Sequence, residues 1–107
     1  MPCLTEETLK PAVAKGRTLV LCRSSWCPFC TAFEPLFRRR AAALTGLPVA
    51  ELVLDDERSP LWDSLKLSVV PTVLLFEDGK VTQRLDGRLG AGLADGPLCA
   101  FLDRVQA

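Results

Sequence analysis

The sequence predicts one α/β domain, in which a mixed four-stranded sheet carries helices on both of its faces. Its 107 residues are enough for one domain with a hydrophobic core of its own. Segments rich in β-branched and aliphatic residues alternate along the chain with segments whose apolar residues recur at helical spacing. The predicted strands are apolar nearly throughout, which is typical of strands that are covered on both faces.

The first half of the chain predicts the order helix, strand, helix, strand. Thr5 is a suitable N-cap for the first helix, and Gly16 is expected to end it. Pro35 lacks an N–H and is expected to bend the second helix. A strand–helix–strand connection is right-handed, so the two strands are expected to be parallel. The predicted ranges are a helix over 5–14, a strand over 18–22, a helix over 28–44 and a strand over 49–54.

The second half predicts a short helix, a β-hairpin and a closing helix. The dipeptide Asp78-Gly79 between two apolar segments is typical of a tight hairpin turn. The predicted ranges are a helix over 61–67, strands over 72–76 and 81–86, and a helix over 95–105. Numbered along the chain, the four strands are expected in the sheet order 2-1-3-4, with both hairpin strands antiparallel to the first pair. Only Met1–Leu4 precede the first helix, so an N-terminal edge strand is expected to be short or absent.

Charge and composition exclude several classes of function. The chain has 13 basic and 13 acidic residues, so its net charge favours neither nucleic acid nor an anionic membrane as a partner. It contains no histidine, which excludes a histidine base and a histidine metal ligand. The N-terminus lacks the pattern of a secretory signal, and the apolar run over 69–76 is far shorter than the ~20 residues that span a membrane. A cytoplasmic monomer with mostly reduced cysteines is therefore expected.

The most informative motif is Trp26-Cys27-Pro28-Phe29-Cys30, between a predicted strand and a predicted helix. A Cys-x-x-Cys in this position is typical of thiol redox proteins. The spacing places the two sulfurs on one side of the first helical turn, where they can form a disulfide. The N–H groups and dipole of the helix N-terminus favour the Cys27 thiolate, and a stabilisation of ~2 kcal/mol would lower its pKa from about 8.5 toward about 7.

The other readings of the cysteines are less well supported. A structural zinc ion needs four ligands, and no histidine is present to complete a set with the two cysteines of the motif. Cys22 on a predicted buried strand and Cys99 on the last helix are expected to be small core residues. Cys3 is expected to be exposed.

These motifs together resemble the thioredoxin family. The resemblance spans roughly residues 4–105 and implies a three-layer α/β/α sandwich that performs thiol–disulfide exchange. Cys27 would be the attacking thiolate, Cys30 the resolving thiol and Pro71 a cis-proline beside them. The matching features are Trp26-Cys27-x-x-Cys30, Pro35, Val70-Pro71-Thr72, Asp78-Gly79-Lys80 and Gly87. The residues that the resemblance assigns to substrate binding are Trp26, Pro28, Phe29, Val70, Thr72 and Gly87.

The chain departs from thioredoxins at the dithiol and beneath it. Pro28-Phe29 between the cysteines is similar to the Pro-Tyr of glutaredoxins. The buried aspartate that thioredoxins carry six residues before the first cysteine is Leu21 here, and its partner lysine is Glu51. These changes are expected to make the redox potential less reducing than the ~−270 mV of thioredoxin, toward the ~−200 to −230 mV of glutaredoxins.

Glu51 is the candidate for the missing proton acceptor. It stands among Val49, Leu52 and Val53, where desolvation would raise its pKa above ~4.3. The resemblance places it beneath Cys30, so it is expected to relay the Cys30 proton. The alternative interpretation is that Glu51 ends its strand near solvent.

The predicted function is the reduction of protein disulfides. A flavin-dependent thioredoxin reductase is the expected electron donor, and glutathione is the alternative. No bound cofactor is expected, because the redox change is carried by a reversible Cys27–Cys30 disulfide. Two other functions stay open: a glutathione-linked glutaredoxin activity, and a binding or assembly module with incidental cysteines.

Overall fold

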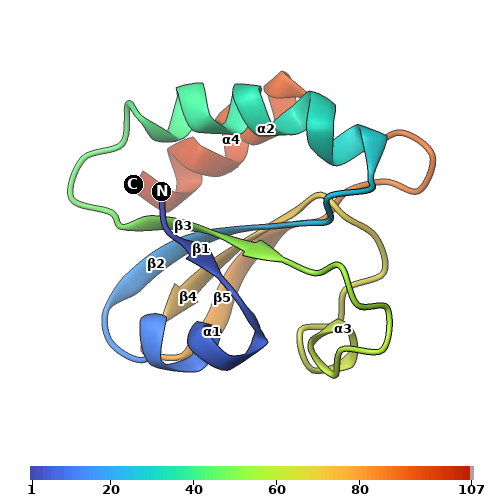
Figure 1. Ribbon diagram of the computed structural model, residues 1–107. Coiled ribbons are helices and arrows are strands. Elements are labelled where there is room, and N and C mark those ends of the chain that lie inside the picture. Colours follow the sequence, from blue (N-terminus) through green and yellow to red (C-terminus); the bar gives the residue numbers. More distant parts are fainter. Residues whose placement is uncertain (107) are drawn as a thin grey trace.

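The computed structural model describes residues 1–106 and contains five strands and four helices within that range. Figure 1 shows them arranged in three layers, with the sheet between two pairs of helices. The strands are β1 (Cys3–Leu4), β2 (Arg17–Arg23), β3 (Val49–Val53), β4 (Thr72–Glu77) and β5 (Lys80–Leu85). The helices are α1 (Glu6–Ala12), α2 (Pro28–Ala41), α3 (Leu61–Ser64) and α4 (Asp95–Gln106).

The sheet has the strand order β1-β3-β2-β4-β5. The predicted order of the four longer strands is confirmed, and a two-residue β1 adds a short edge strand beside β3. Strand β2 is parallel to β3 and antiparallel to β4, as predicted. The expected direction of β5 is wrong. Because the tight turn makes β5 antiparallel to β4, β5 runs in the same direction as β2.

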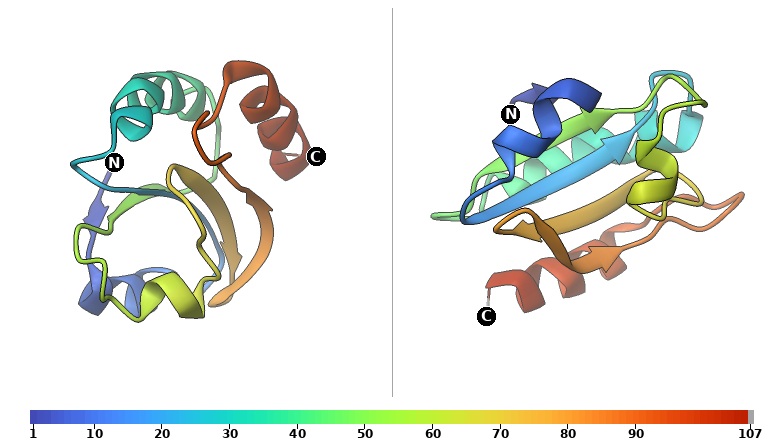
Figure 2. Two further views of the ribbon diagram at one scale, coloured as in Figure 1. Left: turned by 90° about the vertical axis from the view of Figure 1, so that its right-hand side faces the viewer. Right: turned by 90° about the horizontal axis from the view of Figure 1, so that it is seen from below.

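Each face of the sheet carries its own apolar cluster. Helices α2 and α4 cover one face, and α1 and α3 lie against the other (Figure 2). The first cluster contains Phe33 and Phe37 of α2 and Phe101 of α4, all of them buried. Burial of each such side chain contributes roughly 1.5–3 kcal/mol, so this layer anchors α2 firmly on the sheet. Successive residues of β2 point to opposite faces, which explains why the strand is apolar from Leu19 to Cys22.

Three helices end earlier than predicted. Lys66 takes a positive φ of 53°, so α3 ends at Ser64 rather than continuing to Leu67. Helix α1 ends at Ala12 and α2 at Ala41, where the chain passes into turns. The hairpin turn is as predicted, with positive φ at both Asp78 and Gly79. None of the helices within residues 1–106 has the length and apolar character needed to cross a membrane.

Candidate functional site

Cys27 stands at the junction between the central strand β2 and helix α2. It is the N-cap of α2, in extended conformation, and Pro28 occupies the first helical position. The loop before it is tied to the end of β3. The Ser24 hydroxyl donates to the Leu54 carbonyl oxygen at 2.7 Å, and the Ser25 N–H and hydroxyl both donate to the Asp55 carboxylate at 2.7 Å. The loop therefore presents Cys27 on a rigid support at the helix N-terminus, as the sequence predicted.

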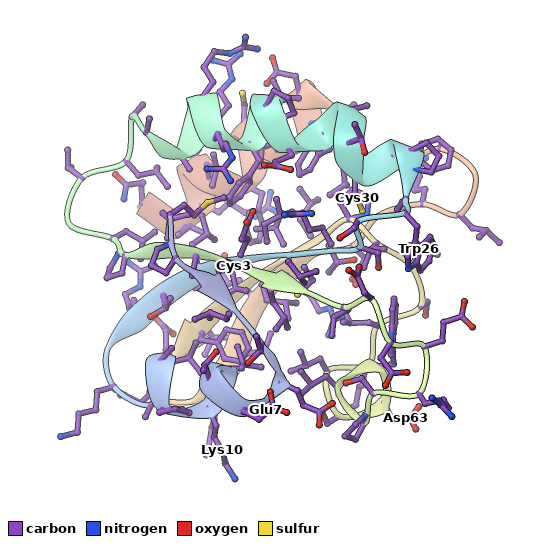
Figure 3. The ribbon with its side chains drawn as sticks, viewed as in Figure 1. Cys3, Glu7, Lys10, Trp26, Cys30 and Asp63 are labelled. Carbon is purple, nitrogen blue, oxygen red and sulfur yellow. The ribbon has the colours of Figure 1, made fainter. Side chains whose placement is uncertain are left out.

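Both thiols of the motif are buried, and they are not bonded to each other. Cys27 is 6% exposed and Cys30 is 2% exposed. The predicted order of exposure is thus correct, but Cys27 is shielded far more than an open nucleophile would be. Figure 3 shows Cys30 on the side of α2 that faces the sheet. Burial, together with the neighbouring Cys27, raises the pKa of Cys30 to about 12, while a Ser24 backbone hydrogen bond and the charge of Arg23 act in the lowering direction.

The segment before β4 closes over Cys27. The Val70–Pro71 peptide bond is cis, and the Cys27 thiol donates to the Val70 carbonyl oxygen at 3.6 Å. Thr72 lies behind this segment, where its hydroxyl donates to the Val69 carbonyl oxygen at 2.9 Å. Gly87 is held against it from the β5 side, since a Cβ there would stand 2.3 Å from the Pro71 carbonyl oxygen. Thr72 and Gly87 therefore support the segment from behind, and their predicted contact with substrate stays a prediction.

A groove of about 330 Å³ opens beside Cys27, and we refer to it below as the groove. Its wall is mainly apolar, and it includes Trp26, which Figure 3 shows at the end of the molecule where β2 passes into α2. The residues predicted to bind substrate and found in its wall are Trp26, Pro28, Phe29 and Val70. Its other lining residues, which the sequence analysis did not assign to the site, are Trp62, Ser68, Val69, Arg88, Leu89 and Gly90. They come from α3 and from connecting loops, where no motif marks them. The signals available in the sequence were Trp62 and the dipeptide Leu89-Gly90.

The model of the family described as thioredoxin matches residues 1–96. The chain belongs to the thioredoxin family. Its relatives include the thioredoxin of Chlamydia pneumoniae, 27% identical over 84 residues that cover 78% of this chain and 81% of the relative. The thioredoxin of Chlamydia muridarum is 29% identical over the same shares of both chains.

Solved structures show the same fold. Thioredoxin f2 of Chlamydomonas reinhardtii superposes with a TM-score of 0.83 at 17% identity, covering 99% of this chain and 96% of that one. A second structure of a thioredoxin f2 contains its complex with ferredoxin:thioredoxin reductase, with a TM-score of 0.83 at 18% identity. It covers 99% of this chain and 94% of that one. The pair Cys27 and Cys30 in a thioredoxin-family chain supports activity as a thiol–disulfide oxidoreductase.

Leu21 packs in the apolar cluster beneath α2 and α4. Glu51 belongs to a cluster of four charged side chains, Arg23, Glu34, Arg38 and Glu51, which we call the charged cluster. Arg23 at the end of β2 donates from Nε and Nη2 to the Glu51 carboxylate at 3.1 and 3.2 Å. Arg38 donates to the same carboxylate at 3.3 Å. Glu34 accepts from Arg38 at 2.9 Å and lies 3.6 Å from Arg23 Nε. The cluster joins β2, β3 and α2.

These contacts correct the expected surroundings of Glu51. The side chain is buried, at 6% exposure, and does not end its strand near solvent. Its carboxylate, however, is held between two guanidinium groups rather than standing alone among aliphatic side chains. The expected relay of the Cys30 proton by Glu51 stays a prediction.

The remaining cysteines lie apart from the groove wall. Cys22 is fully buried in β2, and burial raises its pKa to about 12. Cys99 of α4 is half-buried, with its thiol 3.4 Å from an Asp95 carboxylate oxygen, and burial raises its pKa as well. Cys3 is exposed at the sheet edge. Among residues 1–106, no group of three or more histidine, cysteine, aspartate and glutamate side chains is placed to hold a metal ion.

Proposed function

We propose that this chain reduces protein disulfides, with Cys27 as the attacking thiol and Cys30 as the resolving thiol. The observation that carries the proposal is the position of Cys27. It caps the N-terminus of α2 on the wall of the apolar groove, and its Sγ lies 3.6 Å from the Val70 carbonyl oxygen. The N–H groups of a helix N-terminus favour a thiolate. Membership of the thioredoxin family, whose members are generally disulfide oxidoreductases, points the same way.

The proposed reaction consists of two displacements. The Cys27 thiolate attacks one sulfur of the substrate disulfide, a Cys27–substrate disulfide forms, and the other substrate sulfur leaves as a thiolate. Cys30 then attacks the Cys27 sulfur, the Cys27–Cys30 disulfide forms, and the second substrate sulfur leaves as a thiolate. The Cys30 proton passes to the first departing sulfur. Two electrons move from the protein dithiol to the substrate, which leaves as one thiol and one thiolate.

The assignment of the two roles rests on the surroundings of Cys30. With its pKa raised to about 12, Cys30 keeps its proton near neutral pH and does not compete with Cys27 for the substrate. Part of the increase comes from Cys27 itself. Once Cys27 is bound to the substrate, its charge is gone, and deprotonation of Cys30 becomes easier. The order of attack thus follows from which thiol is ionised at each stage.

The oxidised chain needs a reductant, and a thioredoxin reductase is the partner we propose. The thioredoxin f2 complex with ferredoxin:thioredoxin reductase supports a reductase in general. The flavin-dependent reductase predicted from the sequence is the first donor to test, beside ferredoxin:thioredoxin reductase and reduced glutathione. No bound cofactor is needed in this scheme, and a reducing compartment such as the cytoplasm suits it.

The test is the reduction of a protein disulfide by the purified chain, with each of the three donors in turn. Cys27→Ser should abolish reduction, and Cys30→Ser should accumulate a mixed disulfide with the substrate. Cys99→Ser, a cysteine on the other helix of that layer, is the control and should keep full turnover. Full turnover by Cys30→Ser with glutathione would instead establish a glutaredoxin-type activity. Absence of reduction with every donor would favour a binding module with incidental cysteines.

A further inference from the structure

The connection between β5 and α4 brings an exposed leucine and an arginine to the edge of the groove. Arg88 and Leu89 both line the groove, and Leu89 is 89% exposed. They belong to a tight turn over 88–92, which we call the rim loop. Arg88 N–H donates to the Gly92 carbonyl oxygen at 3.0 Å, and Gly92 N–H donates back at 2.9 Å. Main-chain hydrogen bonds therefore close the rim loop while its two large side chains stay at the surface.

The rim loop is seated directly on the dithiol motif. Gly92 is buried, and a Cβ there would stand 2.9 Å from Cβ of Phe29, the residue that precedes Cys30. Gly92 also takes a φ of +72°, a conformation that other residues rarely adopt. Contact this close fixes the distance between the rim loop and Cys27. The rim loop is therefore fixed in place beside the groove that contains Cys27.

Apart from the Cys27 thiolate of the proposed mechanism, the groove wall carries one charged side chain. Within the described residues 1–106, Arg88 is the only lysine, arginine, aspartate or glutamate in the wall, and the Arg88 guanidinium has no ion pair. The neighbouring Asp86 is already paired with Arg84 at 2.8 Å. An uncompensated cation at the edge of an apolar wall attracts a carboxylate and repels an ammonium group. Exposed apolar side chains around it, Leu89, Trp26 and Phe29, favour an apolar partner.

We propose that the groove selects substrate proteins in which an apolar side chain and an acidic side chain stand beside the cysteine that Cys27 attacks. The apolar side chain packs on Leu89 and the aromatic wall, and the acidic side chain pairs with Arg88. This inference rests on the proposed function, because it names the substrate class of the same site. The partner is an extended segment of a protein, since Val69 and Val70 both line the groove and its volume of about 330 Å³ exceeds that of a single side chain.

The test uses peptides with one internal disulfide and amidated C-termini that differ at a single position next to the attacked cysteine, which is Glu, Gln or Lys. The reduced chain should react about two- to fivefold faster with the Glu peptide than with the Lys peptide, the range expected for one exposed ion pair. Arg88→Gln should remove the preference, and Arg88→Glu should reverse it. Arg39→Gln, an exposed arginine of α2 outside the groove, is the matched control and should leave it intact. Leu89→Ala should slow all three peptides equally.

A second measurement separates this inference from the proposed function. Serine analogues of the same peptides, which have no disulfide, are added to the chain in increasing concentration. Their binding is measured from the fluorescence of the two groove tryptophans, Trp26 and Trp62. Tighter binding of the Glu analogue that is lost in Arg88→Gln supports the inference even if no peptide is reduced. Reduction of all peptides at one rate, a preference that survives in Arg88→Gln, or equal binding of the analogues would overturn it. So would reduction of glutathione disulfide alone, since a small disulfide would then be the substrate.

Discussion

The groove beside Cys27 and the charged cluster beneath α2 consist of different kinds of side chain, although both lie close to the dithiol. The groove is open to solvent, and its wall consists of aromatic and aliphatic side chains and main chain, with a single arginine at its edge. The charged cluster contains two carboxylates and two guanidinium groups, and the exposure of its side chains ranges from 6% for Glu51 to 46% for Arg38. Apolar surface is thus exposed where a substrate would dock, and charges are paired with one another where β2, β3 and α2 meet. The difference suggests that the groove serves recognition and the cluster serves geometry and electrostatics.

The largest expected effect comes from the support behind the groove. A Cβ added at Gly87 meets the Pro71 carbonyl oxygen at 2.3 Å, which the backbone cannot accommodate without moving. Gly87→Ala should therefore displace the Val70–Pro71 segment, cost roughly 3 kcal/mol of stability and lower kcat/KM for protein disulfides by at least tenfold. Gly96→Ala is the control, because nothing lies within 4 Å of a Cβ there. Denaturant unfolding and turnover are the measurements, and an unchanged kcat/KM in Gly87→Ala would show that this segment does not shape the site.

The next effect tests whether the charged cluster is structural. Glu51→Gln leaves Arg23 and Arg38 facing a neutral amide in a covered site, which should lower the free energy of unfolding by roughly 2–3 kcal/mol. Glu77→Gln breaks a half-exposed pair with Arg17 and should cost at most about 1 kcal/mol. The pH–rate profile of the same variant tests the proton relay separately. Loss of one titration from the profile would support Glu51 as the relay, and an unchanged profile would rule the relay out.

The two regions also differ in how far the sequence could predict them. The Cys-x-x-Cys at the start of α2 and the Asp78-Gly79 turn are patterns of neighbouring residues, so their local conformations were correctly expected, whereas the cis bond before Pro71 was expected only from the family resemblance. The partners of Glu51 come from β2 and α2, 28 and 13 residues away in the chain, and depend on strand register and on how α2 lies across the sheet. Arg23 and Arg38 therefore could not be assigned from composition or periodicity. Similarly, Arg88 and Leu89 lie in a connection without periodicity, and only the folded chain brings them to the groove.

A smaller effect should link the charged cluster to the dithiol. Arg23 lowers the pKa of Cys30, although burial raises it more. Arg23→Gln should raise that pKa further, so less Cys30 thiolate is present at any given pH. In the proposed mechanism, release of substrate from the mixed disulfide should slow by about threefold at neutral pH. The pH at which the release rate increases should also be higher in Arg23→Gln than in the parent. Arg17→Gln, at the opposite end of β2, is the matched control. Equal release rates across pH in Arg23→Gln and the parent would limit Arg23 to a structural role.

The smallest effect concerns the anchor of the loop that carries Trp26 and Cys27. Hydrogen bonds from the Ser25 N–H and then from its hydroxyl lower the pKa of the Asp55 carboxyl, with burial acting weakly in the other direction. The folded-state pKa therefore lies below the unfolded value, so this contribution to stability is fully present above the unfolded pKa of about 3.9 and is lost as pH falls through the folded pKa. Asp55→Asn should flatten the fall in unfolding free energy in that acidic range, by a small amount because Asp55 is exposed. Ser25→Ala should likewise flatten the fall in unfolding free energy at acidic pH. If both variants instead lose stability at acidic pH as the parent does, the loop is held by Ser24 and the strand alone.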